Sequence, residues 1–172
     1  RDVKVWLEMF KFKSSNLFKK VIDSVRDVCK ESTFQITSDA LTMQCMDSSH
    51  VCLVSLRLVD SLEISSKNEM IMSLNLSNLY KVICTLDTDT PVKITIVDNK
   101  AQIISDSSYR TCNSHISLMD IEMDPMMIPD IDFPMSIILT SSEFVRLIKD
   151  MNEFGDSIRI TAEPGKVVFR TL

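Results

Sequence analysis

The residues whose types suit catalysis gather in one short stretch, residues 46–51 (MDSSHV). Aspartate, serine and histidine are the types that form a nucleophilic triad, in which the histidine activates the serine hydroxyl. Asp47, Ser48 and His50 are too close in sequence to presume that geometry, and no oxyanion hole accompanies them. A lone histidine beside serines is more often a hydrogen-bonding surface residue than a catalyst. We therefore predict that the chain is not an enzyme.

Glycine, histidine and cysteine usage excludes several other kinds of site. Gly155 and Gly165 are the only glycines, whereas loops for dinucleotides, nucleoside triphosphates or a serine nucleophile need closely spaced glycines. Two histidines, His50 and His115, and five cysteines without a Cys-x-x-Cys pair predict no metal site and no cofactor. An odd cysteine count without an apolar leader predicts reduced thiols in an intracellular compartment.

The overall charge argues against a chain that binds nucleic acid through its whole surface. The sequence has 19 lysines and arginines against 24 acidic residues, a formal net charge of −5. Any DNA contact must therefore come from a local basic patch. The longest apolar stretches, residues 51–58 and 135–139, are far shorter than the roughly 20 residues of a membrane helix.

A repeated five-residue pattern positions these residues. Residues 15–19 (SNLFK) recur as residues 77–81 (SNLYK) and, more loosely, as residues 142–146 (SEFVR). Each copy opens with a serine that can cap a helix, and apolar residues at helical spacing follow. The pattern predicts three amphipathic helices of about three turns.

Strand patterns follow each predicted helix. Residues 34–37, 92–95 and 158–161 alternate as strands do, and turn residues and a second apolar strand come directly after each. The first two copies continue with more strands, so we predict an α+β fold of repeated β-α-β-β-β units with helices on one face of curved antiparallel sheets.

The repeats also predict the domain organisation. Residues 1–118 hold two complete repeats, and residues 134–172 start a second domain that stops after one hairpin. Residues 119–133 contain two prolines and several acidic residues, which disfavour regular structure, so we expect a connector there. Since the chain opens on Arg1 and ends within a repeat, we expect it to be incomplete.

The predicted helices carry cations on the face opposite their apolar residues. Lys19, Lys81 and Arg146 hold the same position in the three copies. For one helix this is an ordinary solvated face with ion pairs such as Lys19 to Asp23. Three such helices in an acidic chain instead favour a basic surface that attracts phosphate without reading sequence.

The order of these motifs resembles the eukaryotic and viral DNA sliding clamps of the proliferating cell nuclear antigen family. The resemblance rests on residues 46–51, 17–23, 118–121 and 128–129, and it covers essentially the whole chain. It implies a homotrimeric ring whose helices surround duplex DNA, acting as a processivity factor for a DNA polymerase and recruiting repair proteins. The expected location is the nucleus, or a viral replication site.

The resemblance further implies which residues face the DNA. They are basic residues of the three helices together with one weaker match outside them: Lys19, Lys20, Arg26, Lys81, Arg110, Arg146 and Lys149. Cys84 falls where the family often has another channel lysine, so the positive lining is expected to be thinner.

The resemblance also implies a pocket for partner proteins, among them the polymerase and the clamp loader. In the family this pocket receives a short peptide, the PIP box, with a glutamine and an aromatic pair. The matching residues are Met46, His50, Val51, Leu53, Met126, Ile128, Pro129 and Phe133. Apolar side chains on an exposed acidic segment suit a groove for an apolar helical turn. The alternative is that residues 126–128 only attach the connector to the sheet.

Two departures from the family pattern keep other interpretations open. Residues 163–165 (EPG) occupy the hairpin where eukaryotic members present a lysine for ubiquitin or SUMO, so this regulation is not expected here. In the family the strand near residues 110–117 pairs with a strand that here would lie beyond Leu172. A structural or virion scaffold protein that has lost ring closure, or a subunit of a checkpoint-type heterotrimeric clamp, are the alternatives.

Overall fold

Two consecutive repeats form the first compact unit of this protein, Arg1–Met126. The computed structural model describes residues 9–60, 62–65, 69–121, 126–128 and 130–172. In chain order the elements of the first unit are β1 (Met9–Phe12), α1 (Ser15–Val25), β2 (Glu31–Ile36), β3 (Leu41–Met46), β4 (Leu53–Leu58), β5 (Leu62–Ile64), β6 (Met70–Asn75), α2 (Leu76–Cys84), β7 (Val92–Val97), β8 (Lys100–Asp106) and β9 (Thr111–Ser117). The predicted β-α-β-β-β repeat is confirmed as β1 to β4 and β6 to β9, and the short strand β5 was not predicted.

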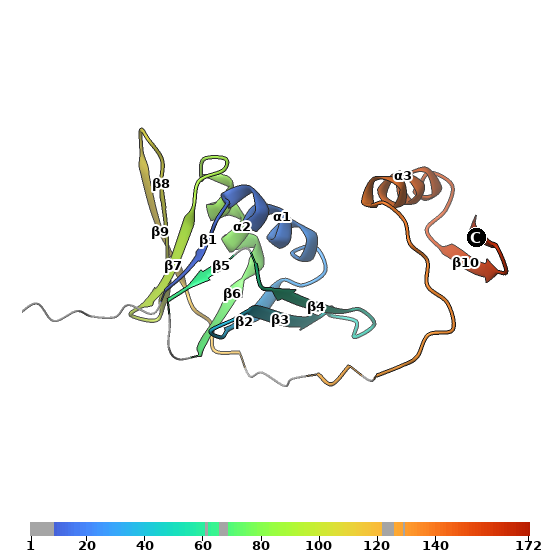
Figure 1. Ribbon diagram of the computed structural model, residues 1–172, viewed down its shortest axis with the longest axis horizontal. Coiled ribbons are helices and arrows are strands. Elements are labelled where there is room, and N and C mark those ends of the chain that lie inside the picture. The colour runs from blue at the N-terminus through green and yellow to red at the C-terminus, as the bar shows by residue number, and fades with distance from the viewer. Residues whose placement is uncertain (1–8, 61, 66–68, 122–125, 129) are drawn as a thin grey trace, which may run out of the picture. The chain divides into compact units, whose positions relative to one another are not determined.

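The first strand of each repeat belongs to the sheet of the other repeat. One antiparallel sheet has the order β4-β3-β2-β6, and the other has the order β5-β1-β7-β8-β9. β1 pairs with β7 from Met9 opposite Thr95 to Phe12 opposite Val92, and β6 pairs with β2 along its whole length. The three strands that follow the helix of each repeat, β2 to β4 and β7 to β9, are therefore joined in their sheet by the first strand of the other repeat (Figure 1).

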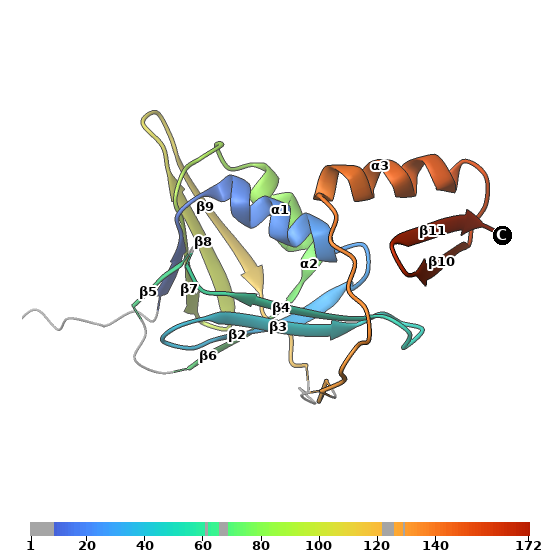
Figure 2. The same ribbon diagram turned by 45° about the vertical axis from the view of Figure 1, so that its right-hand side comes forward.

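The two helices pack side by side in the angle between the sheets (Figure 2). Each buries an apolar stripe at the spacing that the sequence predicted, with Phe18, Ile22 and Val25 from α1 and Leu79 and Ile83 from α2. These residues join the inward-facing side chains of both sheets in one continuous core. The opposite faces of α1 and α2 are left for solvent.

The serines that were expected to cap the helices lie within them: α1 begins at Ser15 itself, and α2 and α3 begin one residue before Ser77 and Ser142. Ser15 lies inside α1, and its hydroxyl donates a hydrogen bond to the Asp87 carbonyl at 2.6 Å. α2 is capped by Asn75, whose side chain accepts from the Asn78 N–H at 3.0 Å. The serine prediction was wrong because the buried Ser15 is used to join α1 to the loop after α2.

None of the helices in the described residues is long and apolar enough to cross a membrane.

A disulfide joins Cys29, just after α1, to Cys45 on β3. The expectation that all five cysteines are reduced is therefore wrong for this pair. Both residues lie in the core, with 3% and 6% of their surface exposed. An odd cysteine count cannot reveal such a pair, because the two cysteines are separated by 16 residues in sequence and meet only in the folded core. Cys52, Cys84 and Cys112 are free.

The second compact unit, Met127–Leu172, holds part of a third repeat. It contains α3 (Ser141–Asn152) and the hairpin of β10 (Ile158–Glu163) and β11 (Lys166–Thr171). Thr140 and Glu143 cap α3 by hydrogen bonding to each other's backbone N–H, so Ser142 is not the cap. No residue of α3 is buried. The boundary between the units falls inside the segment 119–133 that was expected to connect domains, and the domain limits themselves stay a prediction.

Replacing Phe18 by Ala should destabilise the first unit by about 3–5 kcal/mol, the usual cost of removing a buried aromatic ring. Phe18 is 2% exposed, and its ring stacks on that of Phe12 with 4.0 Å between the centroids. Urea unfolding measures the loss. The matched control is Leu17→Ala, because the neighbouring Leu17 is 36% exposed. Equal losses for the two variants would contradict this assignment of the core face of α1.

Candidate functional site

Three of the predicted phosphate-contacting lysines lie on the outer faces of α1 and α2. Lys19, Lys20 and Lys81 are exposed. None of them pairs with a carboxylate in the part of the chain that the structure describes. The Lys19 Nζ atom lies 5.9 Å from the ring centre of Tyr80 on α2, which shows how closely the two basic faces approach.

Arg26, at the C-terminal cap of α1, is held by three neighbouring side chains. Its guanidinium carbon lies 4.1 Å from the ring centre of Tyr80. Its Nε donates a hydrogen bond to Asp23 at 2.8 Å, and its Nη1 lies 3.6 Å from the Asp27 carboxylate. The hydrogen bond from Arg26 lowers the pKa of Asp23. Sequence reasoning missed Tyr80, although it directly precedes the repeated cation Lys81.

Arg110, which directly precedes β9, is also held by hydrogen bonds. Its guanidinium donates to both carboxylate oxygens of Asp87 at 2.7 and 3.1 Å and to the Thr85 carbonyl at 2.7 Å. The Tyr109 hydroxyl donates to the same carboxylate at 2.8 Å. The hydrogen bond from Arg110 is the main cause of the lowered pKa of Asp87. The expected DNA contact Arg110 is thus used to fasten the β8–β9 turn to the loop after α2.

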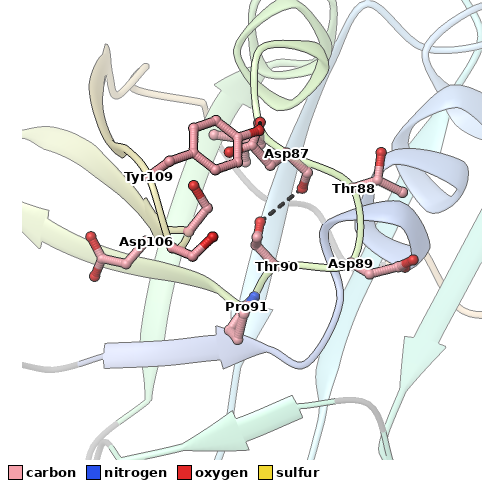
Figure 3. Close-up of a pocket in the computed structure, with 10 residues that line it drawn as sticks. Asp87, Thr88, Asp89, Thr90, Pro91, Asp106 and Tyr109 are labelled. Atoms are coloured by element: carbon pink, nitrogen blue, oxygen red, sulfur yellow. Dashed lines mark hydrogen bonds between the residues drawn. The ribbon is translucent and has the colours of Figure 1, made fainter.

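A hollow of about 610 Å³ lies between this loop and the β8–β9 turn (Figure 3). Hydroxyl and carboxylate groups from both segments line it, including Asp87, Thr90 and Asp106. Within this loop the Thr90 hydroxyl donates to the Asp87 carbonyl at 2.8 Å. Within the described residues no three His, Cys, Asp or Glu side chains gather as metal ligands, here or elsewhere.

The remaining two predicted cations, Arg146 and Lys149, lie on α3 in the second unit. Both are exposed, and neither pairs with a carboxylate among the residues that the structure describes. Lys149 lies in the last turn of α3, where a cation is favoured by the helix dipole.

Asp47 organises the loop between β3 and β4. One of its carboxylate oxygens accepts from the N–H groups of Val51 and Cys52 at 2.9 and 2.7 Å. The other accepts from the N–H of Ser49 at 3.1 Å and from its hydroxyl. The hydroxyl bond from Ser49 and these backbone bonds lower the pKa of Asp47 to about 2. The carboxylate therefore holds a turn and is not the orienting member of a triad.

This turn displays the apolar residues that were expected to bind a partner. Met46 and Leu53 are half-buried and face each other at the ends of β3 and β4. His50 has a left-handed backbone, with φ of 58°, and Val51 is 84% exposed. The structure thus brings four of the eight predicted pocket residues together on one turn.

The middle of the connector is attached to β3, which leads into this turn, by a residue that sequence reasoning missed. The Met126 N–H donates to the Gln44 Oε1 atom at 3.2 Å. The alternation along β3 places Gln44 on the same face as Met46, and this spacing is the signal that could have found it. Ile128 and Phe133, in the second unit, are 56% and 77% exposed. Pro129 lies outside the described residues.

Repeated β-α-β-β-β units with two basic helices packed in the angle between antiparallel sheets define an α+β clamp fold. Residues 7–127 match the N-terminal domain of proliferating cell nuclear antigen, and residues 127–172 match its C-terminal domain. The chain therefore belongs to the proliferating cell nuclear antigen family, whose members are sliding clamps without enzymatic activity.

Individual relatives agree with this assignment. The chain is 31% identical to proliferating cell nuclear antigen 2 of Drosophila melanogaster over 159 residues and 31% identical to proliferating cell nuclear antigen of Caenorhabditis elegans over 170 residues. These matches cover 89% and 94% of this chain but 62% and 65% of the two relatives. The crystal structure of the antigen from Entamoeba histolytica superposes with a TM-score of 0.86 at 29% identity, over 97% of this chain and 70% of that one.

Acid should weaken the turn that Asp47 holds. Because the pKa of Asp47 falls from its ordinary value of 3.8 to about 2 on folding, its stabilising effect is complete above pH 4 and is lost as the pH falls towards 2. We expect Asp47→Asn to lower the melting temperature near pH 6 and to have a smaller effect near pH 2. Thermal unfolding of both proteins measures this. An effect of Asp47→Asn that does not change with pH would contradict the assignment.

Proposed function

We propose that this chain acts as a subunit of a DNA sliding clamp, a ring that encircles duplex DNA and keeps a DNA polymerase on its template. The observation that carries the proposal is the pair of neighbouring helices, α1 and α2, that bury one face between two sheets and expose lysines on the other. Family membership supports the assignment. The exposed lysines of α1 and α2 also give a chain of net charge −5 a local basic surface.

The mechanism is topological, and the helices supply only weak contacts. Lysine side chains on long, flexible stems attract phosphate without requiring a fixed geometry, and water and salt screen the attraction. A ring held on DNA by closure can therefore slide. We propose that three copies close the ring, that β9 contributes an edge to the contact between subunits, and that Arg146 and Lys149 of α3 add to the lining. The proposed location is the nucleus, or a viral replication site.

We further propose that the turn between β3 and β4 and the connector together recruit partner proteins of the PIP-box type, among them the DNA polymerase and the clamp loader. Exposed Val51, half-buried Met46 and Leu53, and the attachment of Met126 to Gln44 support an apolar surface at this turn. Flexible methionine side chains suit a surface that adapts to several aromatic peptides.

Charge reversal on the helices tests the DNA contact. The combined variant Lys20→Glu, Lys81→Glu and Lys149→Glu should lose measurable binding to a labelled duplex at low salt, since each lost phosphate contact also removes about 0.9 from the salt-dependence slope. Fluorescence anisotropy measures both quantities. Lys93→Glu with Lys100→Glu is the control, because these exposed lysines lie on strands β7 and β8. Equal binding losses in the two variants would overturn the proposed DNA-contacting face.

Truncation of Ile128 tests the peptide groove. Ile128→Ala should weaken binding of a Gln-x-x-Ile-x-x-Phe-Phe peptide by about 1–3 kcal/mol, the range for an interface anchor, and should leave the unfolding temperature almost unchanged. Isothermal titration calorimetry measures the affinity. Ile131→Ala is the matched control, because Ile131 has a similar exposure of 54% and lies outside the proposed groove. A loss of stability without a loss of affinity would favour the alternative that residues 126–128 only attach the connector.

A further inference from the structure

We infer that Arg26 and Tyr80 are positioning residues, which fasten α1 to α2 and set the spacing of the lysines, and that Arg26 does not itself contact phosphate. The inference rests on the proposed function, because it divides the basic residues of the DNA-facing helices into two roles. It departs from the role that the family resemblance gave to Arg26.

The surroundings of Arg26 leave little of its side chain available. The guanidinium carbon lies 4.1 Å from the ring centre of Tyr80, well inside the distance at which a cation is attracted to an aromatic face. Hydrogen bonding to Asp23 at 2.8 Å takes up Nε, and Asp27 approaches Nη1 at 3.6 Å. The side chain of Arg26 is only 30% exposed, compared with 79% for Asp27.

The local charge also argues against a phosphate contact at Arg26. A phosphate that approached the guanidinium would come close to two carboxylates, one of which is largely exposed. The hydrogen bond from Arg26 lowers the pKa of Asp23, so this carboxylate stays charged at any pH used for DNA binding. Lys20 and Lys81, in contrast, pair with no carboxylate in the described part of the chain, and each can neutralise a phosphate.

Tyr80 receives two cations, Lys19 of α1 and the C-cap residue Arg26, which lie about two helical turns apart. Arg26 packs on its ring, and the Lys19 Nζ atom lies 5.9 Å from the same ring centre. Lys81 follows Tyr80 directly in α2, so the ring that holds Arg26 also fixes where α2 presents Lys81 relative to Lys19. Phosphates along a duplex have a regular spacing, and a fixed distance between lysines of two helices therefore favours simultaneous contacts.

A charge-matched variant distinguishes the two roles of Arg26. The double variant Asp23→Asn with Arg26→Gln keeps the net charge of the chain. Fluorescence anisotropy of a labelled duplex from about 20 to 150 mM salt measures how steeply the logarithm of the binding constant falls with the logarithm of the salt concentration. This slope should be that of the wild type for the double variant, whereas Lys81→Gln should reduce its magnitude by about 0.9. A similar decrease in slope for the double variant would overturn the inference. Absence of salt-dependent DNA binding by the wild-type chain would instead overturn the proposed function, and the inference with it.

Variants of Tyr80 test the positioning role. Tyr80→Ala should weaken duplex binding about twofold to fivefold, the effect expected from losing an exposed cation–π contact, without changing the salt slope. Tyr80→Phe keeps the ring and should restore wild-type affinity. Failure of Tyr80→Phe to restore affinity would overturn the role of the ring.

The position of Arg26 can also be followed directly by NMR in the full chain. The Arg26 Nε–Hε signal should carry a ring-current shift that Tyr80→Ala abolishes, and adding duplex DNA should leave this signal in place. A shift of the Arg26 signal on DNA addition as large as that of the Lys81 side-chain signals would overturn the inference.

Discussion

The exchange of first strands between the two repeats is the constraint on which the rest of the first unit depends. β1 completes the sheet of β7 to β9, and β6 completes the sheet of β2 to β4, so each repeat needs the other to pair its strands. Because α1 follows β1 and α2 follows β6, the exchange brings both helices into the same angle between the sheets. Their solvent faces then lie on one side, and cations at one repeat position, Lys19 and Lys81, become neighbours.

Side-chain chemistry separates the residues that we propose to contact DNA from the residues that hold the fold. Arg26 and Arg110 each place a planar guanidinium against a carboxylate, Asp23 or Asp87, and both fasten a helix or a turn. The lysines of the same surface have compact charges on flexible stems and remain exposed. A sliding contact requires weak attraction without fixed geometry, so the lysines are better suited to it than the arginines.

Local patterns in the sequence were sufficient for much of the fold, and long-range contacts account for the failures. Helical spacing correctly identified the buried faces of α1 and α2, and alternation with turn residues identified the hairpins. The disulfide of Cys29 with Cys45, the hydrogen bond of Ser15 to Asp87 and the stacking of Arg26 on Tyr80 all join residues from different elements. No local pattern encodes them. For the candidate site, the residue types were predictable. The i,i+3 spacing of Asp23 and Arg26 was a local signal for their ion pair, whereas no local pattern could reveal that Arg110 pairs with Asp87.

The strand exchange also accounts for the second unit. Residues 135–139 precede α3 as β1 precedes α1, yet they form no strand, and Ile138 is 92% exposed. β1 pairs with β7 of the following repeat, whereas no strand among the described residues pairs with residues 135–139. Likewise Val145 of α3, at the repeat position where α1 buries Phe18, is 50% exposed. α1 and α2 bury their apolar stripes where two sheets meet beneath them, whereas the described residues of the second unit provide α3 with the single hairpin of β10 and β11.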